Sequence, residues 1–177
     1  RSMARERLLG LNAIRANPAI VGHSLTGMMD HVNCGEGLFT LFRELKPGTI
    51  DALFDAFAPL RLCLFAEPAT VVRGGTVHLE AVLANEDALP PGDYPVHLQV
   101  LGPNLERLLD RTVPVTIPPR EGEREAPLAL PFFAEDLAVD ADKVGARVRR
   151  RHRLDLVRQA AFLEDPHHLL VGGDGTR

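Results

Sequence analysis

Residues 76–83 read Thr-Val-His-Leu-Glu-Ala-Val-Leu, and this stretch decides the class of fold. Its apolar side chains at 77, 79, 81 and 83 alternate with His78, Glu80 and Val82, which is the period of a β-strand with one buried face. The same alternation, or a short apolar run, returns at residues 60–65, 96–100, 113–117 and 128–133. Turns rich in proline and glycine separate these stretches. Short strands with such turns predict an antiparallel β-sandwich.

The pattern upstream of Pro59 is different. Residues 4–17 carry leucines and an isoleucine at helical spacing, and Asn17-Pro18 ends that helix. The apolar stretch 19–25 predicts a buried strand. Two short helices are expected next, at residues 38–45 and 50–57, with Thr49 as N-cap of the second. Helix, strand and helix in succession are typical of an α/β unit, so we expect a boundary near Pro59.

The pattern changes again after residue 140. Six arginines lie between residues 147 and 158, and the alternation of a closing strand is missing. This predicts either a basic amphipathic helix over residues 144–162 or a tail outside the fold. The expected division is therefore residues 1–58, a β-sandwich at 59–140, and an irregular or helical tail at 141–177.

Composition excludes several classes of protein. Of the 177 residues, 45% are hydrophobic, which is enough for a core, and the net charge of −4 argues against a general nucleic-acid binder. No apolar run approaches the roughly 20 residues of a membrane span, and no signal peptide is recognisable. Two cysteines, Cys34 and Cys63, cannot form a disulfide framework. We expect reduced thiols in a cytoplasmic protein that binds neither nucleic acid nor membrane.

The loop at residues 30–37 holds the densest group of reactive side chains. Asp30, His31, Cys34 and Glu36 are all of metal-binding types, but their spacing matches no closed zinc site. Cys34 with His31 would be a nucleophile pair, and Asp30 with Glu36 a glycosidase carboxylate pair. A polar loop held by local backbone hydrogen bonds explains the same residues, and we favour it. We therefore expect no metal and no cofactor.

Residues 22–38 read Gly-His-Ser-Leu-Thr-Gly-Met-Met-Asp-His-Val-Asn-Cys-Gly-Glu-Gly-Leu, and Phe-Arg-Glu-Leu-Lys-Pro-Gly follows at 42–48. Together they resemble the end of the catalytic barrel of family 2-type glycoside hydrolases. The continuation at residues 58–65, 73–74 and 79–86 resembles the domain that follows that barrel. The resemblance covers roughly residues 4–140, and it rests on the order of elements and on similar stretches, not on a catalytic signature.

The resemblance implies a fold and a site. In that family a (β/α)8 barrel is followed by an immunoglobulin-like sandwich. Residues 20–26 would then be the eighth barrel strand, residues 50–57 the closing helix and residues 60–136 the sandwich. Asp30, His31 and Asn33 would lie at the rim of the active-site mouth, as substrate-contacting residues. The expected fold class is α+β: a short barrel segment, an antiparallel sandwich and a tail.

The chain departs from the family in two ways. The family uses two glutamates, one as acid and one as nucleophile, at the ends of the fourth and seventh strands. Both would lie upstream of Arg1, and Glu36 matches neither position, so we predict no catalytic residue in this chain and no turnover by the chain alone. Second, the sequence after residue 140 does not continue as a sandwich, and an out-of-frame tail is one hypothesis for it.

A lone barrel strand lacks partners for its backbone groups. We therefore expect Ile20, Val21 and Leu25 to be exposed, and residues 1–58 to be poorly ordered or to dock on the sandwich. Exposed strand edges also favour self-association. The expected partner is a carbohydrate substrate of the full-length enzyme.

Two other functions compete with a hydrolase fragment. One is a stand-alone β-sandwich module that binds a protein or a glycan, with the helices as an interaction arm. The other is a small metal- or thiol-dependent enzyme that uses the loop at residues 30–36. Stoichiometric metal would favour the enzyme, and saturable binding without turnover would favour the module.

Overall fold

The computed structural model describes residues 2–71, 74–102, 105–119 and 129–139, and two strands at 154–155 and 159–163. The fold is α+β, mostly antiparallel sheet with two helices within this described part. The elements in chain order are α1 (Ser2–Arg15), α2 (Thr49–Ala56), β1 (Leu60–Glu67), β2 (Thr70–Val71), β3 (Thr76–Asn85), β4 (Gly92–Leu101), β5 (Arg107–Ile117), β6 (Ala129–Ala138), β7 (Leu154–Asp155) and β8 (Gln159–Leu163).

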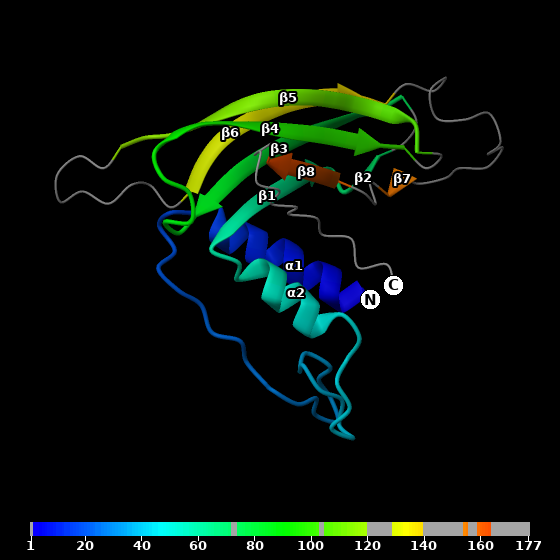
Figure 1. Ribbon diagram of the computed structural model, residues 1–177. Coiled ribbons are helices and arrows are strands. Elements are labelled where there is room, and N and C mark those ends of the chain that lie inside the picture. Colours follow the sequence, from blue (N-terminus) through cyan, green and yellow to red (C-terminus); the bar gives the residue numbers. More distant parts are fainter. Residues whose placement is uncertain are drawn as a thin grey trace.

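The described strands form two three-stranded sheets and one short ladder. The first sheet has the order β1-β3-β6 and the second the order β5-β4-β8, while β2 pairs with β7. Every pairing is antiparallel. Figure 1 shows the two sheets at the top of the molecule and the two helices beneath them.

The two sheets share one hydrophobic core. The inward face predicted for β3, which comprises Val77, Leu79, Ala81 and Leu83, is buried as expected. These side chains pack in one cluster with residues of the other strands, namely Leu60, Leu62, Val96, Leu98, Val100, Leu109, Val115 and Ile117. Burial of each valine, leucine or isoleucine side chain in this cluster stabilises the fold by about 1.5–3 kcal/mol. The alternation and the apolar runs therefore located β1, β3, β4, β5 and β6, while β2, β7 and β8 were not predicted.

A second, smaller cluster lies on the opposite face of the first sheet. Cys63, Val82, Ala84 and Ala129 are buried there, with Ala16 beside α1 packed against them. Val82 was expected on an outward face, but the helices cover this part of the sheet. The face of the first sheet away from the main core is therefore also buried at this end.

Buried polar contacts fix the helices to the sheet. Arg61 on β1 is only 4% exposed; its Nε donates to Asn12 Oδ1 at 2.9 Å, and its guanidinium lies 2.9 Å from the Asp55 carboxylate. Arg15 donates to the carbonyl oxygens of Ala56 and Ala58, at 2.9 and 3.0 Å, where α2 ends. A cation at that end also suits the helix dipole. Docking on the sheets was one of the two outcomes expected for residues 1–58.

Two predicted elements upstream of β1 are absent from the structure. Residues 20–26 form no strand, although Ile20, Val21 and Leu25 are exposed as expected. Without a neighbouring strand, their backbone groups have no ladder to join. Residues 38–45 form turns and bridges, not a helix.

Thr49 is not an N-cap. It is the first residue of α2, and Gly48, with φ 76°, takes the cap position. The Thr49 hydroxyl instead donates to the Lys46 carbonyl at 2.7 Å. The Lys46-Pro47-Gly48 turn shifts the helix start by one residue.

The expected helix over residues 144–162 is also wrong where the structure describes that segment. Leu154–Asp155 and Gln159–Leu163 are strands, and the latter pairs with β4 from Val96↔Leu163 to Val100↔Gln159. An unpaired edge of β4 would offer a row of free N–H and C=O groups, which β8 satisfies. The arginines at 147–153, and the rest of residues 141–177, lie outside the described residues.

Candidate functional site

The loop predicted to carry the site belongs to a compact substructure at residues 28–46, which we call the double-turn unit. Backbone hydrogen bonds join its three short segments: Leu38 N donates to Met28 O at 2.9 Å, Asp30 N to Phe39 O at 2.9 Å, and Lys46 N to Leu38 O at 3.0 Å. The unit therefore has a defined shape although it contains no helix or regular strand.

Two tight turns project from these segments. In the first, His31 N donates to Cys34 O at 2.9 Å and Cys34 N to His31 O at 3.2 Å. In the second, Thr40 N donates to Glu44 O at 2.8 Å, and the Thr40 hydroxyl accepts from Glu44 N at 3.1 Å. Arg43 takes a left-handed conformation, with φ 64°, to close this turn. A threonine side chain bonded to nearby backbone is typical of such loops.

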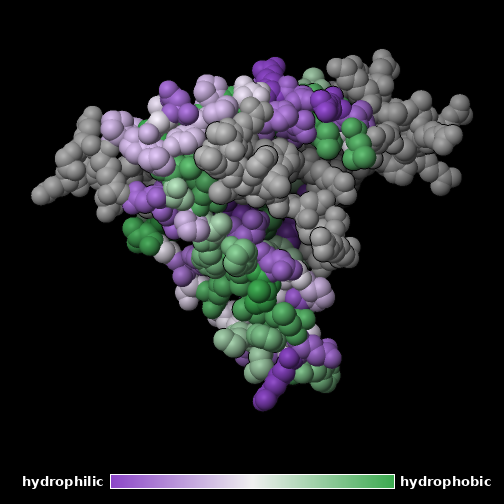
Figure 2. Space-filling view, in the orientation of Figure 1, coloured by the Kyte–Doolittle hydropathy of each residue, from purple (hydrophilic) through white to green (hydrophobic). Residues whose placement is uncertain are grey.

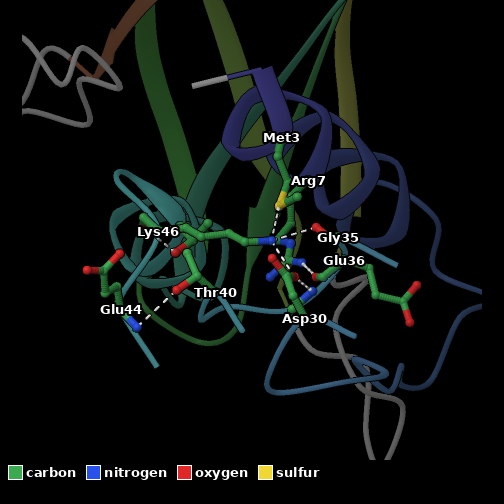
Figure 3. A network of polar contacts seen from close by, with 10 residues as sticks. Met3, Arg7, Asp30, Gly35, Glu36, Thr40, Glu44 and Lys46 are labelled. Atoms are coloured by element: carbon green, nitrogen blue, oxygen red, sulfur yellow. Dashed lines mark hydrogen bonds and ion pairs between the residues drawn. The ribbon is translucent and has the colours of Figure 1, made fainter. Parts of the chain in front are cut away.

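Asp30 is held inside the unit by Lys46, as Figure 3 shows. Asp30 Oδ1 accepts from Lys46 Nζ at 2.5 Å and from Gly37 N at 2.9 Å. Lys46 Nζ also donates to Gly35 O at 2.5 Å and lies 3.7 Å from the sulfur of Met3 on α1. The side chains of Asp30 and Lys46 are each about 15% exposed. The interpretation as a locally bonded polar loop therefore describes Asp30 well, with Lys46 as the added partner.

Gly37 is needed for the close approach of two segments. A Cβ atom placed on Gly37 would lie 2.4 Å from the carbonyl carbon of Met29, which is backbone and cannot move aside. Beside it, the Arg7 guanidinium donates to the Glu36 carbonyl oxygen and ties the loop to α1 (Figure 3). The loop's position relative to α1 thus depends on Met3, Arg7 and Lys46.

The three predicted substrate-binding residues do come together. Asp30, His31 and Asn33 line an open hollow of 570 Å³, and His31 and Asn33 are exposed. The second turn lines the same hollow through Thr40, Leu41 and Phe42. Sequence reasoning missed Phe42 and Lys46, because nothing in the spacing shows that the two turns lie side by side.

Neither thiol is part of a recognisable catalytic arrangement. Cys34 is half-buried in the first turn and Cys63 is buried under the helices, and both are free. Burial raises the pKa of the Cys63 thiol, although Arg61 and Arg15 oppose this effect. Within the described residues, no group of three or more His, Cys, Asp or Glu side chains is arranged to hold a metal ion.

Two histidines on the strands, His78 on β3 and His97 on β4, have carboxylate partners. His78 Nδ1 lies 2.7 Å from Asp136 Oδ1, and Nε2 lies 3.1 Å from Glu80 Oε1. The contact with Asp136, followed by that with Glu80, raises the pKa of His78. The cross-strand register and the i, i+2 spacing place these groups on one face.

His97 makes the corresponding contact on the second sheet. Its Nε2 bonds to Asp110, which also pairs with Arg107 at 2.6 Å. The hydrogen bond from His97 lowers the pKa of Asp110. Since these contacts join neighbouring strands on the surface of each sheet, we assign them to sheet stability.

Among the helices that the structure describes, none has the length and apolar character needed to cross a bilayer. No family model, no curated protein and no solved structure matches the chain.

Proposed function

We propose that this chain is the C-terminal portion of a glycoside hydrolase that cleaves O-glycosidic bonds. In this proposal residues 1–58 complete a (β/α)8 barrel and the sheets form the immunoglobulin-like sandwich behind it. The two catalytic glutamates belong to another part of the polypeptide. The observation that supports it most is the distribution of exposed apolar side chains.

That distribution is strongly uneven. Among the described residues, all exposed large hydrophobic side chains except Leu9 and Leu105 lie between residues 20 and 57. Val21 is 103% exposed, Phe54 84% and Phe42 82%. Figure 2 shows hydrophobic surface gathered over the helices and the segment below the sheets, while hydrophilic surface covers much of the sheets. Large exposed apolar patches are typical of surfaces that another body covers.

Helix α2 shows the same feature within one element. Ile50 and Phe54 of α2 and its C-cap residue Phe57 follow the i, i+4, i+7 spacing of one helix face, and all three are exposed. Thr49 and Ala56 are buried. The helix is thus apolar on an outer face, as a barrel helix would be where a neighbouring helix packs against it.

The double-turn unit fits the proposal in a specific way. Barrel enzymes carry their active sites on the loops after the strands. The unit directly follows residues 20–26, which form no strand in this structure and would become the eighth strand only beside the other strands of a barrel. His31 and Asn33 are free to contact a sugar. Asp30, bound to Lys46 and Gly37, holds the loop in shape.

A second candidate is a stand-alone module that binds a protein partner. The same apolar face favours it, because a partner could cover that surface as well as a barrel could. The hydrolase requires two catalytic glutamates elsewhere in the same polypeptide, whereas the binding module requires none.

Assays of the purified chain test the proposal directly. We expect no hydrolysis of a panel of aryl glycosides, because the acid and the nucleophile are absent from this segment. Turnover that persists after further purification, and that is lost in an Asp30→Asn/Glu36→Gln double variant, would place the carboxylates in this chain and refute the proposal.

A further inference from the structure

The hollow of the double-turn unit has walls that the backbone holds in place. The turn at 31–34 is closed by two hydrogen bonds between His31 and Cys34. The turn at 40–44 is closed through Thr40 and Glu44. The bonds of Asp30, Leu38 and Lys46 behind them set the spacing of the two turns. A site with such walls is preformed, which lowers the entropy cost of binding.

The size of the hollow suits a small molecule. Its 570 Å³ lies within the range of about 300–1,000 Å³ that ligand pockets occupy. It is open to one side, so it would cover part of a ligand and leave the remainder to other contacts.

The two walls differ in chemistry. The second turn contributes Thr40 and the exposed apolar side chains of Leu41 and Phe42, and Phe42, at 82% exposure, gains little from burial in the chain itself. The first turn contributes an exposed Val32, together with the Asn33 amide and the His31 imidazole, which offer donors and acceptors. A pyranose ring has the matching pair of surfaces: a face of C–H groups and an edge of hydroxyl groups.

The charged groups in and beside the hollow favour an uncharged ligand over an anionic one. Asp30 is the acidic side chain in its lining, and Lys46 pairs with it at 2.5 Å. Lys46 directs its ammonium to Asp30 and Gly35 inside the unit, so this cation is already engaged. An anionic sugar would therefore find no cation among the lining residues to pair with, and would lose part of its hydration on entry.

We infer that this hollow binds one pyranose ring of an uncharged glycoside, with Phe42 as the platform on which the apolar face of the sugar stacks. Asn33 and His31 bond its hydroxyl edge. The inference rests on the proposed function and specifies part of its substrate class: neutral glycosides, not uronides.

The test is an NMR titration of the full chain with methyl glycosides of glucose, galactose and mannose, and with the corresponding uronides. We expect saturable shifts of the amides at 31–34 and 40–42 with at least one neutral glycoside. Phe42→Ala should weaken binding by about five- to tenfold, the loss of one aromatic contact. Phe42→Tyr should keep it within about twofold. Phe54→Ala is the matched control, since Phe54 is equally exposed but lies on α2, outside the hollow.

Three results would overturn the inference: no saturable shifts with any neutral glycoside, equal binding by Phe42→Ala and wild type, or equal binding of uronides. Failure of the proposed function is distinguishable from these. If the coding DNA upstream lacks a barrel but Phe42-dependent binding is found, the proposed function fails and the sugar site stands. If the barrel is encoded and no shifts are seen, the inference alone fails.

Discussion

Arg61 is the residue on which the joint between helices and sheet depends most. It is buried, and it bonds to Asn12 of α1 and to the carboxylate and carbonyl of Asp55 in α2. Arg61→Ala leaves Asn12 without this donor and Asp55 without its cation. Because Asp55 retains 32% exposure, water relieves part of the penalty. We expect a loss of about 2–3 kcal/mol in the free energy of unfolding, measured by urea denaturation.

The control for Arg61 is Arg107→Ala. Arg107 also pairs with an aspartate, but its side chain is 68% exposed. Its loss should change stability by no more than about 0.5 kcal/mol. Equal effects of the two substitutions would show that the buried joint is not what fixes the helices.

His78 makes stability depend on pH. Its carboxylate partners Asp136 and Glu80 raise its pKa in the folded chain, so protonated His78 favours folding. The contribution is fully present below the unfolded pKa of about 6.5 and is lost as pH rises through the raised folded pKa. Wild type should therefore exceed His78→Gln in Tm most clearly near pH 6, and the difference should shrink by about pH 8.

The matched control is Asp136→Asn, which removes the first carboxylate partner and leaves the histidine in place. The Tm advantage of wild type over this variant should likewise shrink between about pH 6 and pH 8, because the contact with Asp136 is the main cause of the raised pKa of His78. A His78→Gln difference that grows with pH would contradict the assigned role of the two carboxylates.

The two thiols should react differently. Cys63 is fully buried and its pKa is raised by that burial, so little thiolate is available. Cys34 is half-buried in a surface turn. We expect one thiol to react with a disulfide reagent in the native chain and two after denaturation. The two single variants separate the thiols. If Cys63 in native Cys34→Ser reacted as fast as Cys34 in native Cys63→Ser, the buried position of Cys63 would be contradicted.

At the scale of elements, the double-turn unit depends on Gly37. Gly37→Ala places a Cβ 2.4 Å from the backbone of Met29, so the segments at 28–30 and 37–39 must separate. We expect hydrogen-exchange protection of the amides of Asp30, Leu38 and Phe39 to fall by at least about tenfold. Gly35→Ala is the control, because nothing lies within 4 Å of its Cβ position. Unchanged protection in Gly37→Ala would show that the unit is not held as described.

The strands were predictable because one side of each faces the main core, even where the helices bury the other side of β3 as well. In β3 and β4 the alternation of apolar and polar side chains directly reflects the two faces of a sheet. The same reasoning failed at residues 38–45. Their apolar residues match helical spacing, yet Leu41, Phe42 and Leu45 are exposed and form no buried helix face. Spacing predicts structure only where the spaced side chains share one buried surface.

The candidate site was predictable only in part. The clustering of Asp30, His31 and Asn33 follows from their proximity in sequence. The pairing of Asp30 with Lys46, and the placement of Phe42 across the hollow, depend on how two turns fold against each other. That arrangement comes from backbone hydrogen bonds that join Met28, Asp30, Leu38 and Phe39. The pattern of side chains in the sequence does not predict such bonds.

For the whole molecule, the central question is what covers the apolar face formed by residues 20–57. Exposure of Val21, Ile50 and Phe54 to water is unfavourable, and a covering body would remove that cost. In the proposed enzyme that body is the remainder of the barrel, in the same polypeptide. The open edges of the two sheets make self-association the competing way to cover such surfaces.

The most direct test is the sequence of the coding DNA on both sides of this reading frame. The proposal predicts an in-frame α/β barrel upstream, with glutamates after its fourth and seventh strands. A start signal just before Met3, with nothing barrel-like in frame upstream, would contradict it, and the chain would then be studied as a binding module.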